Sequence, residues 1–212
     1  MNIVKIPLDP ALSPQKNAAK YFKDYKKTYT AEQKLTALTE KDREEIVYFD
    51  SVLDSISRSE SISDITEIRD ELADAGYIKR PSQKRSKQSV ALKFKEYTST
   101  EGYKILVGRN NRENDYLTTV IAGKNDLWFH TKNIPGSHVI VFSGGAEVSE
   151  DTVVKAAKLA AENSKGAGSS NVPVDYTQIK YVKKPSGAKP GMVIYKTNKT
   201  VYVTPDKKEV RE

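Results

Sequence analysis

The sequence of 212 residues predicts an α+β protein, in which a helical coiled-coil arm precedes a mixed α/β domain with a mostly antiparallel sheet. Three observations support this class. Neither Gly nor Pro occurs between residues 15 and 60, and apolar residues recur there at spacings of three and four. From residue 89 onward, short runs alternate apolar and polar residues. The net charge of +7 divides into −2 for residues 1–80 (13 basic, 15 acidic) and +9 for residues 81–212 (22 basic, 13 acidic).

The first predicted element is a long helix that starts at Ser13-Pro14 and ends near Ser57. Polar residues interrupt its apolar seam near residues 36–40, where we expect a break or a change of register. A seam this narrow favours an antiparallel coiled coil with part of its partner helix outside the chain. The alternative is a helical bundle that packs on the C-terminal part of the chain. The seam positions are Ala18, Phe22, Tyr25 and Tyr29, followed by Ile46, Phe49, Leu53 and Ile56.

A short second helix is predicted next, capped by Ser61 or Ser63 and ended at Gly76, which can adopt a left-handed conformation. Residues 79–87 are basic, polar and aperiodic, which is typical of a linker. We therefore predict a helical region at residues 1–80, a linker at 81–88 and a basic α+β domain at 89–212.

The second part is predicted to hold about seven strands and two helices. The helices are expected over residues 110–121 and directly after Ser149, which is a suitable cap. The last two strands are expected to form a hairpin through residues 196–199. The strands are predicted over residues 90–94, 103–107, 127–130, 138–142, 176–182, 192–195 and 200–203.

Several classes of function are disfavoured. The sequence has no Cys, so thiolate metal sites, disulfides and thiol nucleophiles are absent. No run of 18 apolar residues suggests a membrane span, and the N-terminus does not resemble a secretory signal, so a cytosolic protein is expected. His130 and His138 match neither a metal pattern nor a catalytic one, and a hydrolase built on them is the weakest alternative. No cofactor is predicted, and Trp128 is expected in the core.

Charge combined with aromatic residues is the main chemical signal. Between Ile179 and Lys208 there are eight lysines and one acid, Asp206, with tyrosines interleaved. This pattern favours binding to RNA phosphates, although lysines also keep proteins soluble and protect sheet edges. The predicted nucleic-acid-binding residues are Arg109, Arg112, Lys132, Lys180, Lys183, Lys184 and Lys189.

Three motifs resemble a known family. They are Gly108-Arg109-Asn110-Asn111 with Glu113-Asn114-Asp115, Asp126-Leu127-Trp128-Phe129-His130 through Pro135-Gly136-Ser137-His138, and Val182-Lys183-Lys184-Pro185 through Gly187-Ala188-Lys189-Pro190-Gly191. These motifs resemble the NFACT-R domain. Leu8-Asp9-Pro10, Asn17-Ala18 and Tyr21-Phe22 resemble the coiled-coil region that precedes it. The resemblance covers nearly the whole chain and implies an NFACT-R-like domain in the C-terminal half of an NFACT-family protein.

The family comprises RqcH-like and NEMF-like ribosome quality-control factors. The resemblance therefore implies a noncatalytic part of a factor that binds large ribosomal subunits obstructed by peptidyl-tRNA, with rRNA and tRNA as partners. It also implies support of C-terminal alanine tailing by the longer protein, and it supplies no catalytic residues. Because members are often labelled fibronectin-binding proteins, the alternative is a fibronectin-binding adhesin module at the cell surface. The oligomeric state is left open.

Overall fold

The computed structural model describes residues 3–80 and 93–206. These residues form four α-helices and eight strands, which confirms the predicted α+β class. Packing groups the chain into two compact units, Met1–Ile46 and Val47–Glu212, whose boundary falls inside the first helix. The predicted linker at residues 81–88 lies outside the described residues, so the predicted three-part division stays a prediction.

Helix α1 (Pro14–Ser57) is continuous over 44 residues, so the break predicted near residues 36–40 is wrong. The residues there, including Leu38 and Glu40, are good helix formers, and backbone propensity maintains the helix where the apolar seam is interrupted. The helix starts where expected, since the Lys16 N–H donates to the Ser13 hydroxyl at 3.3 Å. Phe22, Tyr25 and the other aromatic seam residues are exposed, so their pairing in a coiled coil stays a prediction.

Helix α2 (Ile62–Asp74) begins with a capping box. The Ser61 hydroxyl accepts from the Asp64 N–H at 3.2 Å, and the Asp64 carboxylate accepts from the Ser61 N–H at 3.0 Å, which satisfies two free donors. Gly76, at φ 81°, terminates the helix as predicted. Ile68 packs with Tyr48 and Val52 of α1 in a small core of the second unit.

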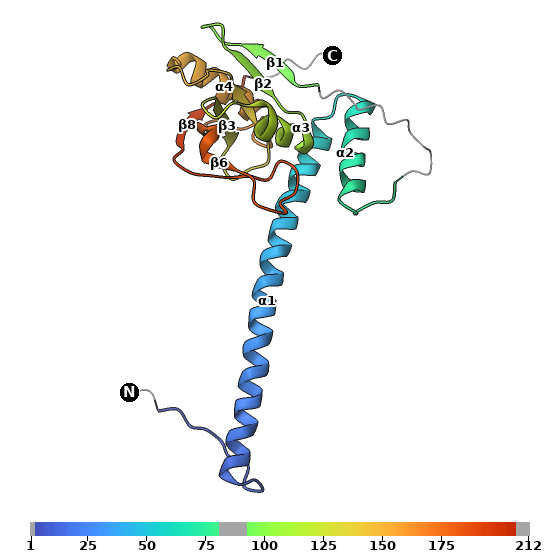
Figure 1. Cartoon of the computed structure of the whole chain (residues 1–212), viewed down its shortest axis with the longest axis vertical. Coiled ribbons are helices and arrows are strands. Elements are labelled where there is room, and N and C mark those ends of the chain that lie inside the picture. Colours follow the sequence, from blue (N-terminus) through green and yellow to red (C-terminus); the bar gives the residue numbers. More distant parts are fainter. Residues whose placement is uncertain (1–2, 81–92, 207–212) are drawn as a thin grey trace. The chain divides into compact units, whose positions relative to one another are not determined.

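One six-stranded sheet, with every neighbouring pair antiparallel, forms the centre of the second unit (Figure 1). Its order is β1-β2-β4-β3-β5-β8, which confirms the mostly antiparallel sheet. A separate pair joins β6 and β7. The strands are β1 (Lys95–Thr98), β2 (Lys104–Val107), β3 (Leu127–Thr131), β4 (Val139–Val141), β5 (Val172–Gln178), β6 (Val182–Lys183), β7 (Ile194–Tyr195) and β8 (Lys199–Val203).

The hairpin predicted through residues 196–199 is wrong, because β7 pairs with β6 whereas β8 pairs with β5. Residues 196–198 instead cross from the small sheet to the large one. The alternation that predicted both strands identifies them as strands but does not specify their partners. The single strand predicted over 176–182 is likewise replaced by the end of β5, a 3₁₀ turn at Ile179–Tyr181 and β6.

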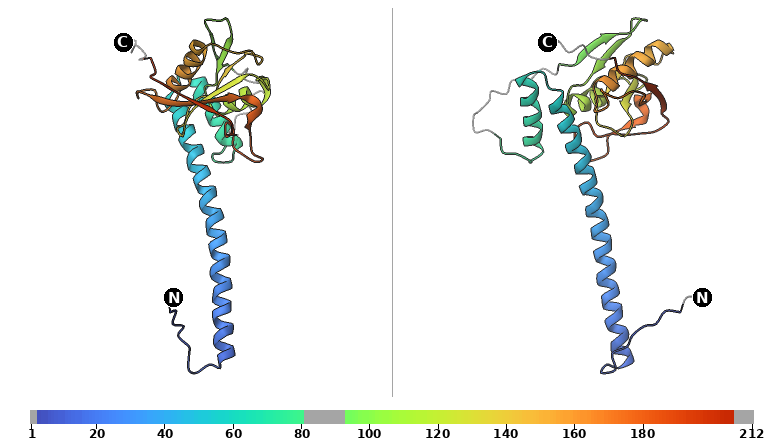
Figure 2. Two further views of the ribbon diagram at one scale, coloured as in Figure 1. Left: turned by 90° about the vertical axis from the view of Figure 1, so that its left-hand side faces the viewer. Right: turned by 180° about the vertical axis from the view of Figure 1, so that it is seen from behind.

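The two faces of the large sheet are covered differently (Figure 2). Helix α4 (Glu150–Glu162), capped by Ser149 as predicted, packs its alanines on one face against Phe129 and the neighbouring valines. The opposite face carries Trp128, which is fully buried as predicted. The helix expected over 110–121 covers this face as α3 (Asn111–Tyr116) followed by a π-helical turn (Leu117–Ile121). In the described residues, no helix combines the length and the apolar character needed to cross a membrane.

Candidate nucleic-acid interface

Five exposed lysines come from three segments of the second unit: the turn before β3, the 3₁₀ turn with β6, and the segment from β7 to the first residue of β8. The Lys180 N–H donates to the Lys124 carbonyl at 3.0 Å, which joins the turn before β3 to the 3₁₀ turn. The Lys196 N–H donates to the Tyr181 carbonyl at 3.3 Å. Within the described part of the chain these lysines have no ion-pair partner. We call this set the lysine patch: Lys124, Lys180, Lys183, Lys196 and Lys199.

Asp126, two residues after Lys124 of the patch, is buried. Its two carboxylate oxygens accept from the N–H groups of Gly123 and Gly144, each at 2.8 Å. Its charge is therefore used to hold two turns in place. The ammonium groups of the patch stay available to an external anion, because nothing acidic among their described neighbours neutralises them.

The next two predicted lysines, Lys184 and Lys189, are tethered. Lys184 Nζ lies 2.8 Å from the Asp115 carboxylate, which also accepts from the Gly191 N–H at 3.2 Å. Lys189 Nζ lies 4.6 Å from the ring centroid of Tyr77 and 5.7 Å from that of Tyr48, which are cation–π distances. Both lysines thus fix the 184–191 loop against neighbouring elements of the second unit.

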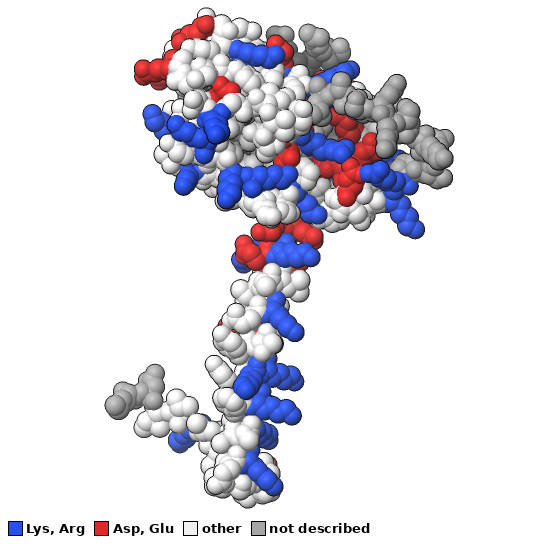
Figure 3. Space-filling model, viewed as in Figure 1, with Lys and Arg blue, Asp and Glu red and all other residues white. Residues whose placement is uncertain are grey.

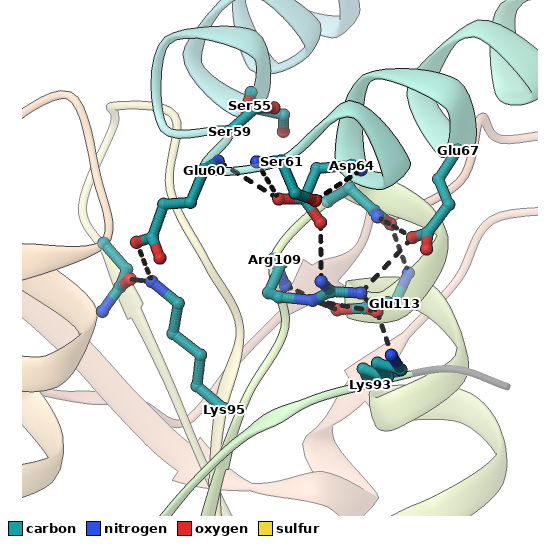
Figure 4. Close-up of polar contacts among 12 residues, drawn as sticks. Ser55, Ser59, Glu60, Ser61, Asp64, Glu67, Lys93, Lys95, Arg109 and Glu113 are labelled. Carbon is teal, nitrogen blue, oxygen red and sulfur yellow. Dashed lines mark hydrogen bonds and ion pairs between the residues drawn. The ribbon is translucent and has the colours of Figure 1, made fainter.

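Arg109 occupies the centre of a cluster of carboxylates (Figure 4). Its guanidinium lies 2.6 Å from Asp64, 2.6 Å from Glu113 and 3.5 Å from Glu67. The hydrogen bonds to Glu113 raise the pKa of Arg109 above its ordinary value, although burial alone would lower it. We call these four residues the arginine–carboxylate cluster. Arg109 was predicted to bind anions, but in this structure its charge is balanced by three acids of the chain itself.

The cluster fastens α2 to the start of α3. Burial alone would raise the pKa of Asp64, but contacts with Ser61, the N–H of Glu60 and Arg109 hold that pKa below its ordinary value. Burial raises the pKa of Glu67, which accepts from the Asn110 amide at 2.9 Å. A pocket of about 60 Å³ beside the cluster is lined by charges of both signs that are already paired, and it holds room for only a few waters.

The remaining predicted residues lie beside carboxylates. Arg112, 42% exposed, is 2.6 Å from Asp74, and Lys132, 43% exposed, is 3.9 Å from Asp175. Neither belongs to the lysine patch. In Figure 3 carboxylates gather beside Lys and Arg side chains where α2 meets α3, and further Lys and Arg side chains are spread over the rest of the sheet domain. The structure therefore separates the seven predicted residues by their partners. Lys180 and Lys183 of the patch have no acidic partner among the described residues, although Lys180 Nζ lies 5.2 Å from the ring centroid of the adjacent Tyr181. The other five contact carboxylates or, in the case of Lys189, the rings of Tyr77 and Tyr48.

The two histidines lie beside Trp128, where His138 is buried and His130 is half-buried. The His130 ring stacks on Trp128 with centroids 5.6 Å apart, and His138 Nδ1 lies 2.7 Å from the Thr118 hydroxyl. Burial lowers the pKa of His130 to about 4 and that of His138 well below its ordinary value, so both rings are neutral at pH 7. In the described residues no group of three or more His, Asp or Glu side chains is arranged to hold a metal ion.

Three patch residues were not among the predicted site residues: Lys124, Lys196 and Lys199. Lys196 and Lys199 belong to the lysine-rich stretch between Ile179 and Lys208, which the sequence analysis associates with RNA binding. Lys124 had no such signal, because it lies more than fifty residues earlier and joins the patch through a backbone hydrogen bond. Pairing between distant segments determines its position, and local sequence patterns do not report such pairing.

Two family descriptions match consecutive parts of the chain. The family described as NFACT N-terminal and middle domains matches residues 2–91. The family described as NFACT protein RNA binding domain matches residues 93–197, a range that includes four of the five patch lysines. The two matches meet next to the predicted linker.

Similar proteins give a consistent result. Among curated proteins, one described as "Rqc2 homolog RqcH" from Bacillus subtilis (strain 168) is 46% identical over 205 residues, covering 96% of this chain and 35% of that protein. A protein of the same description from Streptococcus pneumoniae (strain D39) is 42% identical over 208 residues, covering 98% of this chain and 37% of that protein. The chain thus spans about a third of the length of these relatives.

A solved structure is also similar. It is the C-terminal part of the fibronectin/fibrinogen-binding protein of Streptococcus suis, which is 43% identical with a TM-score of 0.83, covering 91% of this chain and 77% of that one. Its name gives fibronectin and fibrinogen as ligands of that protein. Taken with the two consecutive family matches and the α+β fold described above, this similarity shows that the chain belongs to the NFACT family.

Proposed function

We propose that this chain is a noncatalytic RNA- and ribosome-binding part of a longer ribosome quality-control factor. The observation that carries the proposal is the lysine patch, whose five exposed ammonium groups have no acidic partner among the described residues. A nucleic-acid backbone is the polyanion that such a surface fits, because each neutralised phosphate releases condensed counterions. The match of residues 93–197 to an RNA-binding domain family supports this assignment.

Within the patch, we assign the central contacts to Lys180, Lys183 and Lys196, which the 3₁₀ turn and the β6–β7 pair hold together. Lys124 and Lys199 flank them. Arg109, Lys184 and Lys189 are left out of the proposed contact, because each is half-buried and already has partners inside the chain. Lys180 is kept because it is exposed, although its ammonium group also lies near the Tyr181 ring. Phosphate contacts position a protein on RNA without reading its sequence, so the choice of RNA is assigned to the rest of the longer protein.

The partners that fit this role are the large ribosomal subunit, its rRNA and tRNA. Two relatives carry the description "Rqc2 homolog RqcH", and the resemblance noted from the sequence implies binding to large subunits obstructed by peptidyl-tRNA. We propose that this part anchors the longer protein on such subunits in the cytoplasm while C-terminal alanine tails are added. Fibronectin binding is supported only by the name of a similar protein, and it serves as an alternative outcome of the test.

The test is co-sedimentation of the chain with purified large ribosomal subunits over a range of salt concentrations. The patch variant replaces Lys180, Lys183 and Lys196 by Ala. The paired variant replaces Lys104, Arg112 and Lys158 by Ala, which removes the same charge from residues that lie 3.0, 2.6 and 2.8 Å from carboxylates. Immobilised fibronectin is the parallel ligand.

We expect the wild-type chain and the paired variant to sediment with the subunits at low salt. The patch variant should bind at least about tenfold more weakly, since three lost phosphate contacts weaken binding steeply. Binding to fibronectin together with no sedimentation of the wild-type chain would contradict the proposal. Equal sedimentation of the wild type and the patch variant would show that another surface contacts the subunits.

A further inference from the structure

A second set of lysines forms a straight row on α1, in the first compact unit. Lys16, Lys20, Lys23, Lys27 and Lys34 are all exposed and are separated by four, three, four and seven residues. At about 100° per residue these positions fall within an arc of about 60° on the helix surface. At about 1.5 Å per residue the row is about 27 Å long. Figure 3 shows the Lys and Arg side chains of this part of α1 along one side of the helix.

The composition of this lysine row differs from that of an ordinary solvated helix face. Lysines three and four residues apart repel one another, whereas a surface helix usually mixes both signs so that neighbouring charges attract. The only acids between Pro14 and Leu35 are Asp24 and Glu32, which lie about 70° and 150° from the centre of the row. Among the described residues none of the five lysines has an ion-pair partner. Within the described part of the chain, no ion pair therefore offsets the repulsion along the row.

The start of the helix shows the same bias. The first turn of α1 contains no acidic residue and instead carries Lys16, although the positive end of the helix dipole lies there. A negative ligand along the row would compensate both the repulsion among the lysines and this unfavourable placement. The charge pattern thus indicates a polyanionic partner.

The lysine row and the aromatic seam lie on opposite faces of α1. Tyr21, Phe22, Tyr25 and Tyr29 centre about 180° from the row, and the rings of Phe22, Tyr25 and Tyr29 stack at centroid distances of 6.4 and 5.9 Å. A helix that packed on the aromatic seam would leave the lysine row open. The two faces are therefore free to contact different partners at the same time.

We propose that the lysine row binds the phosphate backbone of double-stranded RNA, as a contact separate from the lysine patch. The row is narrow and linear, which fits a line of phosphates better than a planar anionic surface. A membrane is less suitable, because the aromatic face lacks the apolar area that insertion into a bilayer interface requires. Glu32, Thr36 and Arg43 continue that face after Tyr29, and they restrict its apolar part to a few turns.

The test measures binding of the full chain to a double-stranded RNA of about 30 base pairs, which is longer than the row, over a series of salt concentrations. The row variant replaces Lys20, Lys23 and Lys27 by Gln, which keeps helix propensity. The control variant replaces Lys5, Lys26 and Arg43 by Gln, which removes the same charge from exposed positions outside the row. Circular dichroism checks that helix content is unchanged.

We expect the slope of log affinity against log salt to become shallower by about two to three in the row variant and to change by less than about one in the control. The proposal would be overturned if the row variant and the control variant lost the same affinity for RNA. It would also be overturned if the row variant kept the affinity and the salt slope of the wild type. Binding of the row to phosphatidylserine vesicles but not to RNA would overturn it too. The patch variant is measured on the same RNA. A failure of the lysine row to bind RNA can then be distinguished from a failure of the lysine patch, on which the proposed function depends.

Discussion

The arginine–carboxylate cluster and the lysine patch are both rich in charge, but they use it in opposite ways. In the cluster, Arg109 contacts three carboxylates, and Glu113 is completely buried. In the patch, five ammonium groups face solvent without an acidic partner among the described residues. Buried, paired charges resist separation strongly, whereas exposed lysines contribute little to folding. From this difference we infer that the cluster stabilises the fold, and we propose that the patch serves binding.

The same contrast divides residues that are close in sequence. Lys183 is exposed, whereas its neighbour Lys184 contacts Asp115 at 2.8 Å. A count of lysines in the C-terminal stretch treats the two as equivalent. Assigning a function to each of them requires the position of the nearest carboxylate, which the three-dimensional fold supplies.

Replacement of Arg109 by Met should have the largest effect. Three carboxylates would lose their shared cation, and Glu113 would stay buried without it, so the free energy of unfolding should fall by about 3–5 kcal/mol. Urea denaturation measures this loss. Arg112→Ala, which disrupts a more exposed pair, is the control and should cost less than about 1 kcal/mol. A loss below about 1 kcal/mol for Arg109→Met would show that the cluster does not hold the fold.

Lowering the pH tests how buried titratable groups contribute to the free energy of unfolding, because the lysines stay protonated throughout. Because burial lowers the pKa of His130 to about 4, the unfolded chain binds a proton between pH 6.5 and 4 that the folded chain does not. The free energy of unfolding should therefore fall as the pH falls through this window, by up to about 3 kcal/mol from His130. Burial raises the pKa of Glu71, which opposes the trend near the lower end.

The variant His130→Gln isolates the contribution of this imidazole. Thermal unfolding measured from pH 7 to pH 4 should show a smaller loss of stability in the variant than in the wild type, whatever its stability at pH 7. An identical pH dependence in both proteins would show that His130 is accessible to protons in the folded state.

Comparison of Lys189 with Lys183 gives the smallest expected effect. Lys189 Nζ contacts the rings of Tyr77 and Tyr48, so Lys189→Ala should lower the free energy of unfolding by about 1 kcal/mol. Lys183→Ala should change it by less than about 0.5 kcal/mol, since the side chain is exposed. Equal stabilities of the two variants would remove the distinction between tethered and exposed lysines.

Local features of the fold were predictable from the sequence. The start of α1, the Ser61 cap, the turn at Gly76, the Ser149 cap and the buried Trp128 depend on residues near one another in the chain, and all five predictions are confirmed. The predicted hairpin at residues 196–199 failed because strand pairing is a long-range property.

The candidate site was predictable only in part, for the same reason. The interaction of Arg109, just before the cap of α3, with Glu113 in the first turn is local in sequence, but Asp64 and Glu67 lie more than forty residues earlier and leave no periodic signal. The sequence therefore favoured Arg109 as an anion-binding residue, and only the packing of α2 reveals that its charge is balanced. Lys124 is the converse case, since distant pairing brings it to the patch.

The most direct test of the central distinction is a salt titration of affinity for ribosomal RNA, with the wild type, the patch variant and the paired variant compared side by side. Both variants lack three positive charges, so general electrostatic attraction falls equally. If exposed lysines without partners contact phosphates, the slope of log affinity against log salt becomes shallower by about two to three in the patch variant and stays within about one of the wild type in the paired variant. Equal slopes in the two variants would contradict the distinction, because net charge alone would then account for RNA binding.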